Sequence, residues 1–208
     1  MDIKPLLLAA LNDALACPDS GKSKGAIHHN RSKAFVEALA EHLREAYRNR
    51  PDVYVLSRGC SQYRAQFGLN ELLYDILVCE AGTAKSLCCG SDITHVIRAL
   101  WAIECEFATD LRKAMQDFNK LVIAASESKL FIGPQVTDEF SFLESLLPAA
   151  VYCSSGTSAA LVPHPAAWRT GAPDVHLYVF DEGRAQWEPV CEGTFADREQ
   201  FAEASPTG

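Results

Sequence analysis

The sequence predicts one α/β domain of mixed type. The chain has 208 residues, of which 48% are hydrophobic and 22% charged. It is long enough to bury a core without disulfides, and this composition is not that of a disordered or fibrous protein. Segments of helical and strand periodicity follow one another in the order helix, three strands, helix, strand, which is typical of a mixed α/β domain with a C-terminal elaboration.

The N-terminal part is predicted to hold two helices joined by a loop. Residues 3–16 have apolar side chains at helical spacing, whereas residues 17–31 are polar and rich in Gly and Ser, so a flexible loop is expected there. Ser32 is a suitable N-cap for a second, amphipathic helix, which Pro51 closes.

Three strand candidates come next, at residues 53–57, 70–80 and 99–108. A helix is predicted over residues 110–124, with an apolar stripe, and a strand over residues 129–132, which Gly133 and Pro134 end. These elements form the predicted core.

The C-terminal part is less regular. A helix is predicted over residues 138–147, strands over 149–153 and 175–181, and a long loop rich in Pro, Gly and Ser over 154–173. The predicted division is an N-terminal helix and flexible loop, residues 1–31, and a single domain, residues 32–208.

Acidic side chains interrupt the faces of two predicted strands. Asp75 lies in the middle of the strand 70–80, and Glu104 and Glu106 share one face of the strand 99–108 with alanines. Buried carboxylates are costly unless they are paired or bind a cation. If the strands are neighbours, the three carboxylates converge and suit Mg²⁺ or Mn²⁺, which can activate water for attack on a phosphodiester.

A simpler interpretation stays open for the same residues. Glu104 and Glu106 would point to solvent from a half-exposed strand, and Asp75 would pair with Arg58 or Arg64. The small side chains around the two glutamates favour the metal site, because they leave room for a ligand.

The element order and these acids resemble the core of the PD-(D/E)xK nuclease superfamily over residues 32–133. The resemblance implies a restriction-endonuclease-like core with a mixed central sheet, in which Asp75 and Glu104 bind Mg²⁺ or Mn²⁺. The position of the family's lysine is occupied by Glu106, a departure that some members share.

The resemblance also implies that a lysine and an acid come from the helices. In some members the lysine lies on the helix after the third strand, where Lys113 and Lys120 share a face, seven residues apart. The alternative is that both lysines belong to a solvated helix face. An acid of the first core helix often completes such sites, and Glu37 or Glu41 is the candidate.

The charge distribution bears on the expected partner. Lys and Arg number 19 against 27 Asp and Glu, a net charge of −8, which disfavours a protein that coats nucleic acid through a general basic surface. However, nine of the 19 basic residues lie within residues 22–64, interleaved with tyrosines. They would form the rim of a nucleic-acid groove or, alternatively, an ordinary solvated surface.

The N-terminus and the apolar runs predict a cytoplasmic protein with no membrane contact. The longest apolar runs fall short of the roughly 20 residues that span a bilayer. Asp2 and Lys4 precede a short apolar stretch that does not read as a secretory signal. The eight cysteines are therefore expected to be free thiols.

The sequence thus leads to a metal-dependent endonuclease, with DNA preferred over RNA as the substrate. Two alternatives stay open: a catalytically inactive nuclease-fold protein with a binding or regulatory role, and a metal-dependent hydrolase of a small phosphorylated ligand. A homodimer is one expected assembly, because many nucleases pair to cut both strands, and the helix of residues 3–16 would serve as its packing arm.

Overall fold

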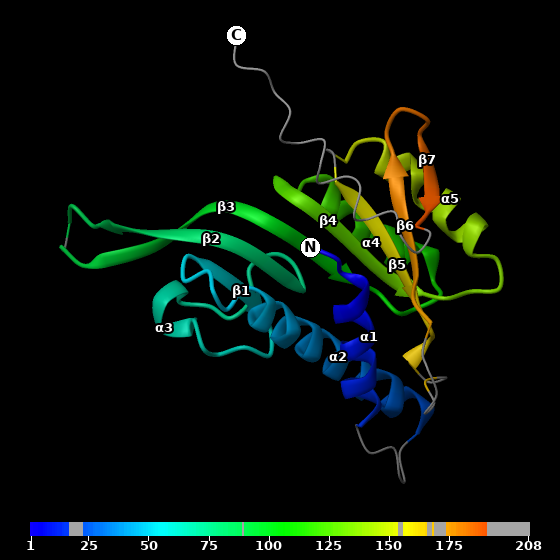
Figure 1. Cartoon of the computed structure of the whole chain (residues 1–208), viewed down its shortest axis with the longest axis horizontal. Helices are drawn as coiled ribbons and strands as arrows, with labels where there is room; N and C mark the ends of the chain where they lie inside the picture. The colour runs from blue at the N-terminus through cyan, green and yellow to red at the C-terminus, as the bar shows by residue number, and fades with distance from the viewer. Residues whose placement is uncertain (17–22, 89, 154–155, 166–167, 169–173, 191–208) are drawn as a thin grey trace.

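Seven strands form one mixed sheet with helices on both faces (Figure 1). The computed structural model describes residues 1–16, 23–88, 90–153, 156–165, 168 and 174–190. The strands lie in the sheet in the order of the chain, from β1 to β7. The prediction of a mixed α/β fold is confirmed at this level.

The elements have the following bounds. The helices are α1 (Lys4–Leu15), α2 (Lys24–Ala46), α3 (Arg64–Phe67), α4 (Leu111–Val122) and α5 (Glu139–Ala150). The strands are β1 (Val53–Ser57), β2 (Ile76–Lys85), β3 (Asp92–Cys105), β4 (Ser126–Pro134), β5 (Thr157–Val162), β6 (His176–Asp181) and β7 (Gln186–Pro189). β1, β2 and β3 pair antiparallel, β3, β4 and β5 pair parallel, and β6 and β7 continue antiparallel.

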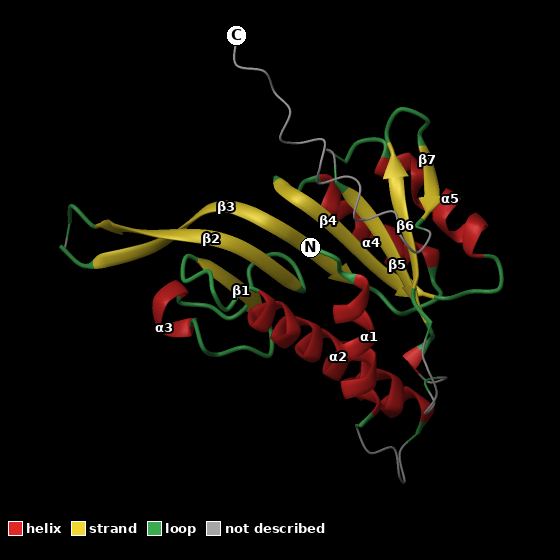
Figure 2. Cartoon of the chain, viewed as in Figure 1, coloured by secondary structure: helices red, strands yellow, loops and turns green. Residues whose placement is uncertain are grey.

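The sheet lies between two layers of helices (Figure 2), and the buried apolar side chains form two clusters. On one face, α1 and α2 pack through residues such as Leu7 and Phe35 against Val78 of β2. On the other face, α4 and α5 pack through residues such as Phe118 against Phe131 of β4. Because side chains alternate along a strand, each central strand contributes to both layers, which explains why these strands are apolar along most of their length.

Helix α2 begins nine residues earlier than the sequence predicts. Its N-cap is Ser23, whose hydroxyl accepts a hydrogen bond from the Ala26 amide at 3.3 Å. In the first turns, Arg31 is buried and donates to two backbone carbonyls of the segment after β5, both at 2.8 Å. The predicted start at Ser32 and the predicted loop over residues 24–31 are therefore wrong, because a distant segment supplies the partner of a polar side chain; residues 17–22 of that loop lie outside the described residues.

β2 and β3 extend past their neighbours as a two-stranded arm, whose described residues are 81–88 and 90–98 (Figure 1). The arm lies between the two strands predicted at 70–80 and 99–108, so both strands are longer toward the arm than the sequence predicts. β2 starts later than predicted because Leu73 has a left-handed backbone, φ 66°, just before it. The arm has no apolar alternation of its own; antiparallel pairing between the two strands extends it.

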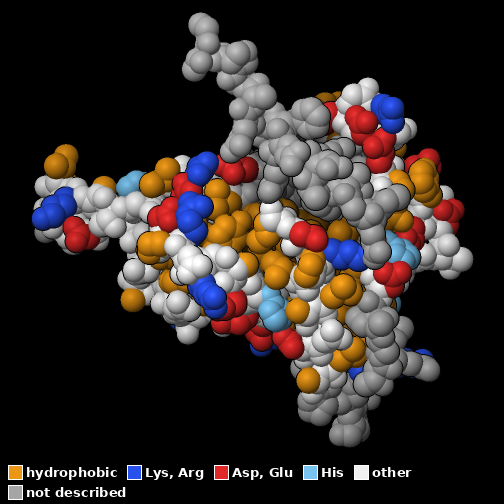
Figure 3. Space-filling view, in the orientation of Figure 1, with side chains coloured by type: hydrophobic (Ala, Val, Ile, Leu, Met, Phe, Trp, Pro, Cys, Tyr) orange, Lys and Arg blue, Asp and Glu red, His pale blue; other side chains and the backbone are white. Residues whose placement is uncertain are grey.

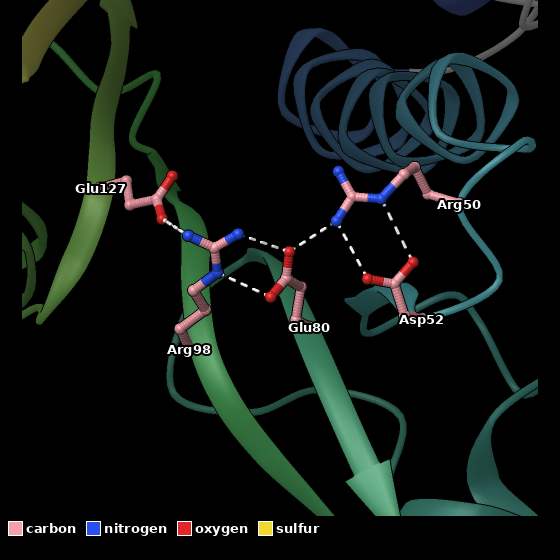
Figure 4. Close-up of polar contacts among 5 residues, drawn as sticks. All are labelled: Arg50, Asp52, Glu80, Arg98 and Glu127. Carbon is pink, nitrogen blue, oxygen red and sulfur yellow. Dashed lines mark hydrogen bonds and ion pairs between the residues drawn. The ribbon is translucent and has the colours of Figure 1, made fainter.

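A chain of ion pairs crosses the base of the arm (Figure 4). Glu80 of β2 accepts hydrogen bonds from Arg98 of β3 at 2.6 and 2.7 Å and from Arg50 at 2.5 Å. Arg98 also donates to Glu127 of β4 at 2.5 Å, and Arg50 donates to Asp52 at 2.9 Å. The hydrogen bond from Arg98 holds the pKa of Glu80 below its ordinary value. The network thus ties β2 to both of its flanks at the point where the arm leaves the sheet.

Replacing Glu80 with glutamine is expected to loosen the arm. The amide cannot hold two guanidinium groups as a carboxylate does, so β2 and β3 should open more often at the arm's base. Hydrogen-deuterium exchange should become faster in residues 81–98, while the centre of the sheet is unchanged. The control Glu127→Gln, at the exposed end of the network with one partner, should have a smaller effect. Equal exchange in both variants would refute a role for Glu80 in holding the arm.

The C-terminal predictions were partly correct. α5 and β6 confirm the helix expected at 138–147 and the strand expected at 175–181. The strand predicted at 149–153 is wrong, since these residues end α5 and form the following turn. β5 lies inside the predicted loop 154–173, because it is buried on both faces and shows no alternation; residues 154–155, 166–167 and 169–173 of that loop lie outside the described residues.

The described cysteines are free thiols, as predicted; they are Cys60, Cys79, Cys88, Cys105 and Cys153. The other three, Cys17, Cys89 and Cys191, lie outside the described residues. None of the helices in the described part of the chain is long and apolar enough to cross a membrane. The helix predicted as a packing arm for a dimer, α1, has its apolar side buried against α2 of the same chain.

Candidate functional site

Asp75 and Glu104 are brought together by the pairing of β2 and β3. Ile76, the first residue of β2, is opposite Ile103, so the positions before and after this pair also face each other. The Asp75 carboxylate accepts a hydrogen bond at 2.9 Å from the amide of Cys105, the last residue of β3. The two acids therefore lie at the same end of the sheet, as the sequence predicts for neighbouring strands.

Glu104 is a fully buried carboxyl group with one oxygen unsatisfied. Its side chain has no exposed surface. Oε2 accepts a hydrogen bond from Lys120 Nζ at 2.9 Å, whereas Oε1 is buried and has no hydrogen-bond partner among the described residues. An unsatisfied buried oxygen of this kind costs free energy, so it calls for an explanation such as a ligand.

Lys120 reaches Glu104 from α4, the helix that connects the parallel strands β3 and β4. Asp110 caps this helix, and its apolar side holds Phe118 in the core. Lys120 also contacts Asp117, one turn earlier, at 2.8 Å. Partial burial alone lowers the pKa of Lys120, but the hydrogen bonds to Asp117 and Glu104 outweigh it and raise this pKa above its ordinary value. Lys120 therefore stays charged beside the buried acid.

The two acids hold protons more tightly than free carboxyl groups do. Burial, with the nearby charge of Asp75, raises the pKa of Glu104 to about 8. Burial also raises the pKa of Asp75, although the Cys105 amide and the charge of Lys120 oppose the shift. Such pairs of shifted acids are typical of catalytic and metal-binding sites.

Asp75 opens into a cavity of about 470 Å³ between α2 and the ends of β2 and β3. Glu37 of α2 lines the same cavity, as do three basic side chains, those of His29, Lys33 and Arg58. Gly59 makes room for Glu37, because a Cβ at this glycine would lie 2.6 Å from the Glu37 side chain. The cavity combines two acids with basic groups on its rim, a set that can bind a phosphate beside a cation.

Glu106 does not join this pair, contrary to the prediction. β3 ends at Cys105, and the Glu106 carboxylate turns back to accept a hydrogen bond from the Ala108 amide at 2.7 Å. Its charge acts on His28 near the start of α2 instead. No three His, Cys, Asp or Glu side chains within the described ranges converge closely enough to hold a metal ion. The strand ends before its alternation can place Glu106 beside Glu104.

Two other predicted residues also lie elsewhere. Glu41 is paired with Arg44 at 2.6 Å on the exposed part of α2, so Glu37 is the helix acid that reaches the cavity. Lys113 is exposed in the first turn of α4, two turns away from the lysine that contacts Glu104.

The alternative pairing of Asp75 with an arginine does not occur. Among the ion pairs and hydrogen bonds of the described residues, none joins Asp75 to Arg58 or Arg64. Arg58 lines the same cavity, but the contact that holds the Asp75 carboxylate comes from a backbone amide. The acid is therefore oriented without being neutralised by an arginine.

Sequence reasoning did not assign Asp117 or His29 to the site, whereas Lys33 and Arg58 belong to the basic residues of 22–64 that were expected at the rim of a groove. A signal for Asp117 was present, because residues three apart on a helix face each other and Asp117 precedes Lys120 by three. No comparable signal existed for His29, which depends on knowing that α2 starts before residue 31. Because residues 17–31 were predicted to be a loop, His29 could not be placed on a helix beside the cavity.

Basic and acidic side chains are interspersed on the face that Figure 3 shows, and among the described residues they form no continuous basic surface there. This agrees with the negative net charge of the chain. Contact with a polyanion would therefore depend on local groups at the cavity.

No protein-family model matches the chain, and no curated protein or solved structure shows significant similarity to it.

Proposed function

We propose that the protein hydrolyses phosphodiester bonds of nucleic acid with the help of a divalent cation, on a restriction-endonuclease-like core. The core topology supports this proposal. Helix α2 precedes the antiparallel strands β1, β2 and β3, and α4 then leads to β4, which is parallel to β3. This is the element order of the PD-(D/E)xK nucleases that the sequence resembles.

The observation that carries the proposal is the buried Glu104 carboxyl group beside Asp75. A structural acid in this position would be expected to have partners for both oxygens, yet Oε1 has none among the described residues. Lys120 contacts the other oxygen from α4, the helix to which some members of the resembled family move their lysine. These contacts favour a site for a charged ligand.

The residues fit a magnesium or manganese ion held by two carboxylates. Asp75 and Glu104 would hold it, with Oε1 of Glu104 as a free oxygen ligand. Mg²⁺ typically uses one or two carboxylates and keeps several waters, so a third acid is not required. When bound, the ion would supply positive charge for the phosphate and lower the pKa of a water.

The remaining groups of the site would position the substrate. Lys33 and Arg58 of the cavity lining would bind phosphate oxygens, and Lys120 would hold the Glu104 carboxyl group in place through its hydrogen bond to Oε2. Because Lys120 is 42% exposed, it can also move from Glu104 toward a phosphate. DNA is preferred over RNA as substrate on the resemblance alone.

Purified protein with Mg²⁺ or Mn²⁺ should cleave DNA or RNA, and EDTA should stop the reaction. Asp75→Asn and Lys120→Met should lower the rate about 10- to 100-fold, as expected for changes to a metal ligand or its close support. The measurement is release of labelled fragments from single-stranded and duplex substrates.

Two matched variants serve as controls. Glu106→Gln and Lys113→Met remove the same chemical groups from positions outside the cavity, and both should cleave like the parent protein. If all four variants cleave equally, the activity belongs to a contaminating nuclease. If Glu106→Gln loses activity as Asp75→Asn does, the assignment of the acid pair is wrong.

The second candidate function is nucleic-acid binding without cleavage. It is favoured by the complete burial of Glu104 and by the contact of Lys120 with one of its oxygens, since this contact closes part of the proposed ion site. Binding of oligonucleotides with no cleavage under any divalent cation would select this function.

A further inference from the structure

A second hollow lies beside the Asp75 cavity, and Arg58 lines both. Its volume is about 490 Å³, within the range of about 300–1,000 Å³ that is common for ligand pockets. The second hollow is lined by Arg58, Arg64, Gly68, Leu69, Asn70, Glu71 and Leu73. The two hollows therefore share one guanidinium group, that of Arg58.

The arginines of the second hollow differ from most others in the protein. Five arginines have carboxylate partners: Arg44, Arg48, Arg50, Arg98 and Arg184. In the described part of the chain, neither Arg58 nor Arg64 makes an ion pair. Two guanidinium groups without carboxylate partners in the lining of one hollow suit phosphates of a polynucleotide.

Asn70 gives independent evidence for a ligand. The oxygen of its side-chain amide, Oδ1, is buried and lacks a hydrogen-bond partner in the described structure. An amide presents a donor and an acceptor together, which matches the edge of a nucleobase. Asn70 is itself one of the residues that line the hollow.

Leu73 provides an apolar surface in the lining of the hollow. Its side chain is 72% exposed, and its backbone has φ 66°, which a non-glycine residue rarely adopts. Leu73 also lies two residues before Asp75, so the path from this side chain to the proposed reacting phosphate is short. An exposed leucine held in this way can cover the face of an unstacked base.

We propose that the second hollow binds the nucleotide next to the reacting phosphate, with that nucleotide unpaired. Arg58 and Arg64 would bind the phosphates on its two sides, Leu73 would cover the base, and Asn70 would contact the base edge. A paired base cannot occupy such a hollow without leaving its stack, so single strands should bind more tightly than duplexes. This inference rests on the proposed function and adds the substrate class.

Binding of fluorescent 12-nucleotide single strands, DNA and RNA separately, and of a duplex tests the proposal by fluorescence anisotropy in EDTA. Arg64→Gln should weaken single-strand binding and reduce the slope of log affinity against log salt by about 0.7, the value for one phosphate contact. Leu73→Gly suits the left-handed backbone and should weaken binding about fivefold to tenfold, as for loss of a base contact, with the salt slope unchanged.

The matched controls are Arg112→Gln on the exposed start of α4 and Leu87→Gly at the exposed tip of the arm. Both should bind like the parent protein. Tighter binding of the duplex, no binding of single strands, or equal affinities of all four variants would overturn the proposal. Single-strand binding that needs Arg64 and Leu73, without cleavage when Mg²⁺ is added, would support the subsite and refute hydrolysis. Cleavage that neither Arg64→Gln nor Leu73→Gly affects would support hydrolysis and refute the subsite.

Discussion

The Glu104→Gln variant should be more stable than the parent protein at pH 8, and the difference should nearly vanish at pH 5. Folding raises the pKa of Glu104 from 4.5 to about 8, so the folded chain holds a proton that the unfolded chain releases. The parent therefore loses stability as pH rises through this window, by about 1.4 kcal/mol per pH unit. Glutamine is neutral at both pH values and lacks this dependence.

Urea denaturation in EDTA at pH 5, 6.5 and 8 measures the effect. Between pH 5 and 8 the free energies of unfolding of the two proteins should diverge by on the order of 4 kcal/mol. Glu127→Gln, which changes a carboxylate that is 53% exposed, is the matched control and should follow the parent. Parallel pH profiles of parent and Glu104→Gln would mean that Glu104 is not a buried acid with a raised pKa.

The same titration connects stability to the proposed cation. An ion that binds only the folded protein stabilises it, and a bound cation also favours the charged carboxylate. Mg²⁺ or Mn²⁺ should therefore raise the stability of the parent at pH 8 more than that of Glu104→Gln. An equal gain in stability in both proteins would mean that Glu104 does not bind the metal ion. It would not contradict the raised pKa of Glu104.

The Phe118→Ala variant should lose about 3–5 kcal/mol of unfolding free energy, the usual cost of emptying a large buried aromatic site. Phe118 has no exposed surface, and its ring packs edge-on against Phe131 of β4 and Trp187 of β7. It thus joins α4 to both the centre and the edge of the sheet. A cavity here cannot easily close, because strands surround it on one side.

Thermal and urea denaturation of Phe118→Ala should be compared with Ile123→Ala, which truncates an apolar residue at the end of the same helix. Ile123 is 78% exposed, so this control should stay within about 0.5 kcal/mol of the parent. Because α4 also carries Lys120, Phe118→Ala should lower cleavage at temperatures where it is still folded. A loss below 1 kcal/mol would mean that α4 is held mainly by other contacts.

Elements with strong local patterns were predictable. α4 has a polar cap at Asp110 and an apolar stripe, and it was found within two residues of its bounds. β1 was found at its predicted bounds because it is a short β-rich segment between turn signals. Local sequence decides such elements because their capping and burial need few distant partners.

Elements that depend on distant partners were missed or misplaced. The start of α2 depends on hydrogen bonds that Arg31 donates to two backbone carbonyl groups more than 130 residues later in the chain. β5 depends on its two neighbouring strands, and the arm of residues 81–98 depends on pairing between its own strands. Strand pairing is a long-range choice, so propensity alone does not locate it.

The sequence by itself determined the mixed α/β class and the acids as candidate ligands, because these follow from periodicity and from the cost of burying charge. That the strands of Asp75 and Glu104 are antiparallel neighbours was only a condition of the metal-site hypothesis, and the structure supplied it. Only the tertiary structure decided which residues meet. It ended β3 before Glu106, turned Lys120 rather than Lys113 to Glu104, and brought Glu37 to the cavity. Strand ends and helix rotation are set by packing between elements, and a shift of one residue moves a side chain to the other face.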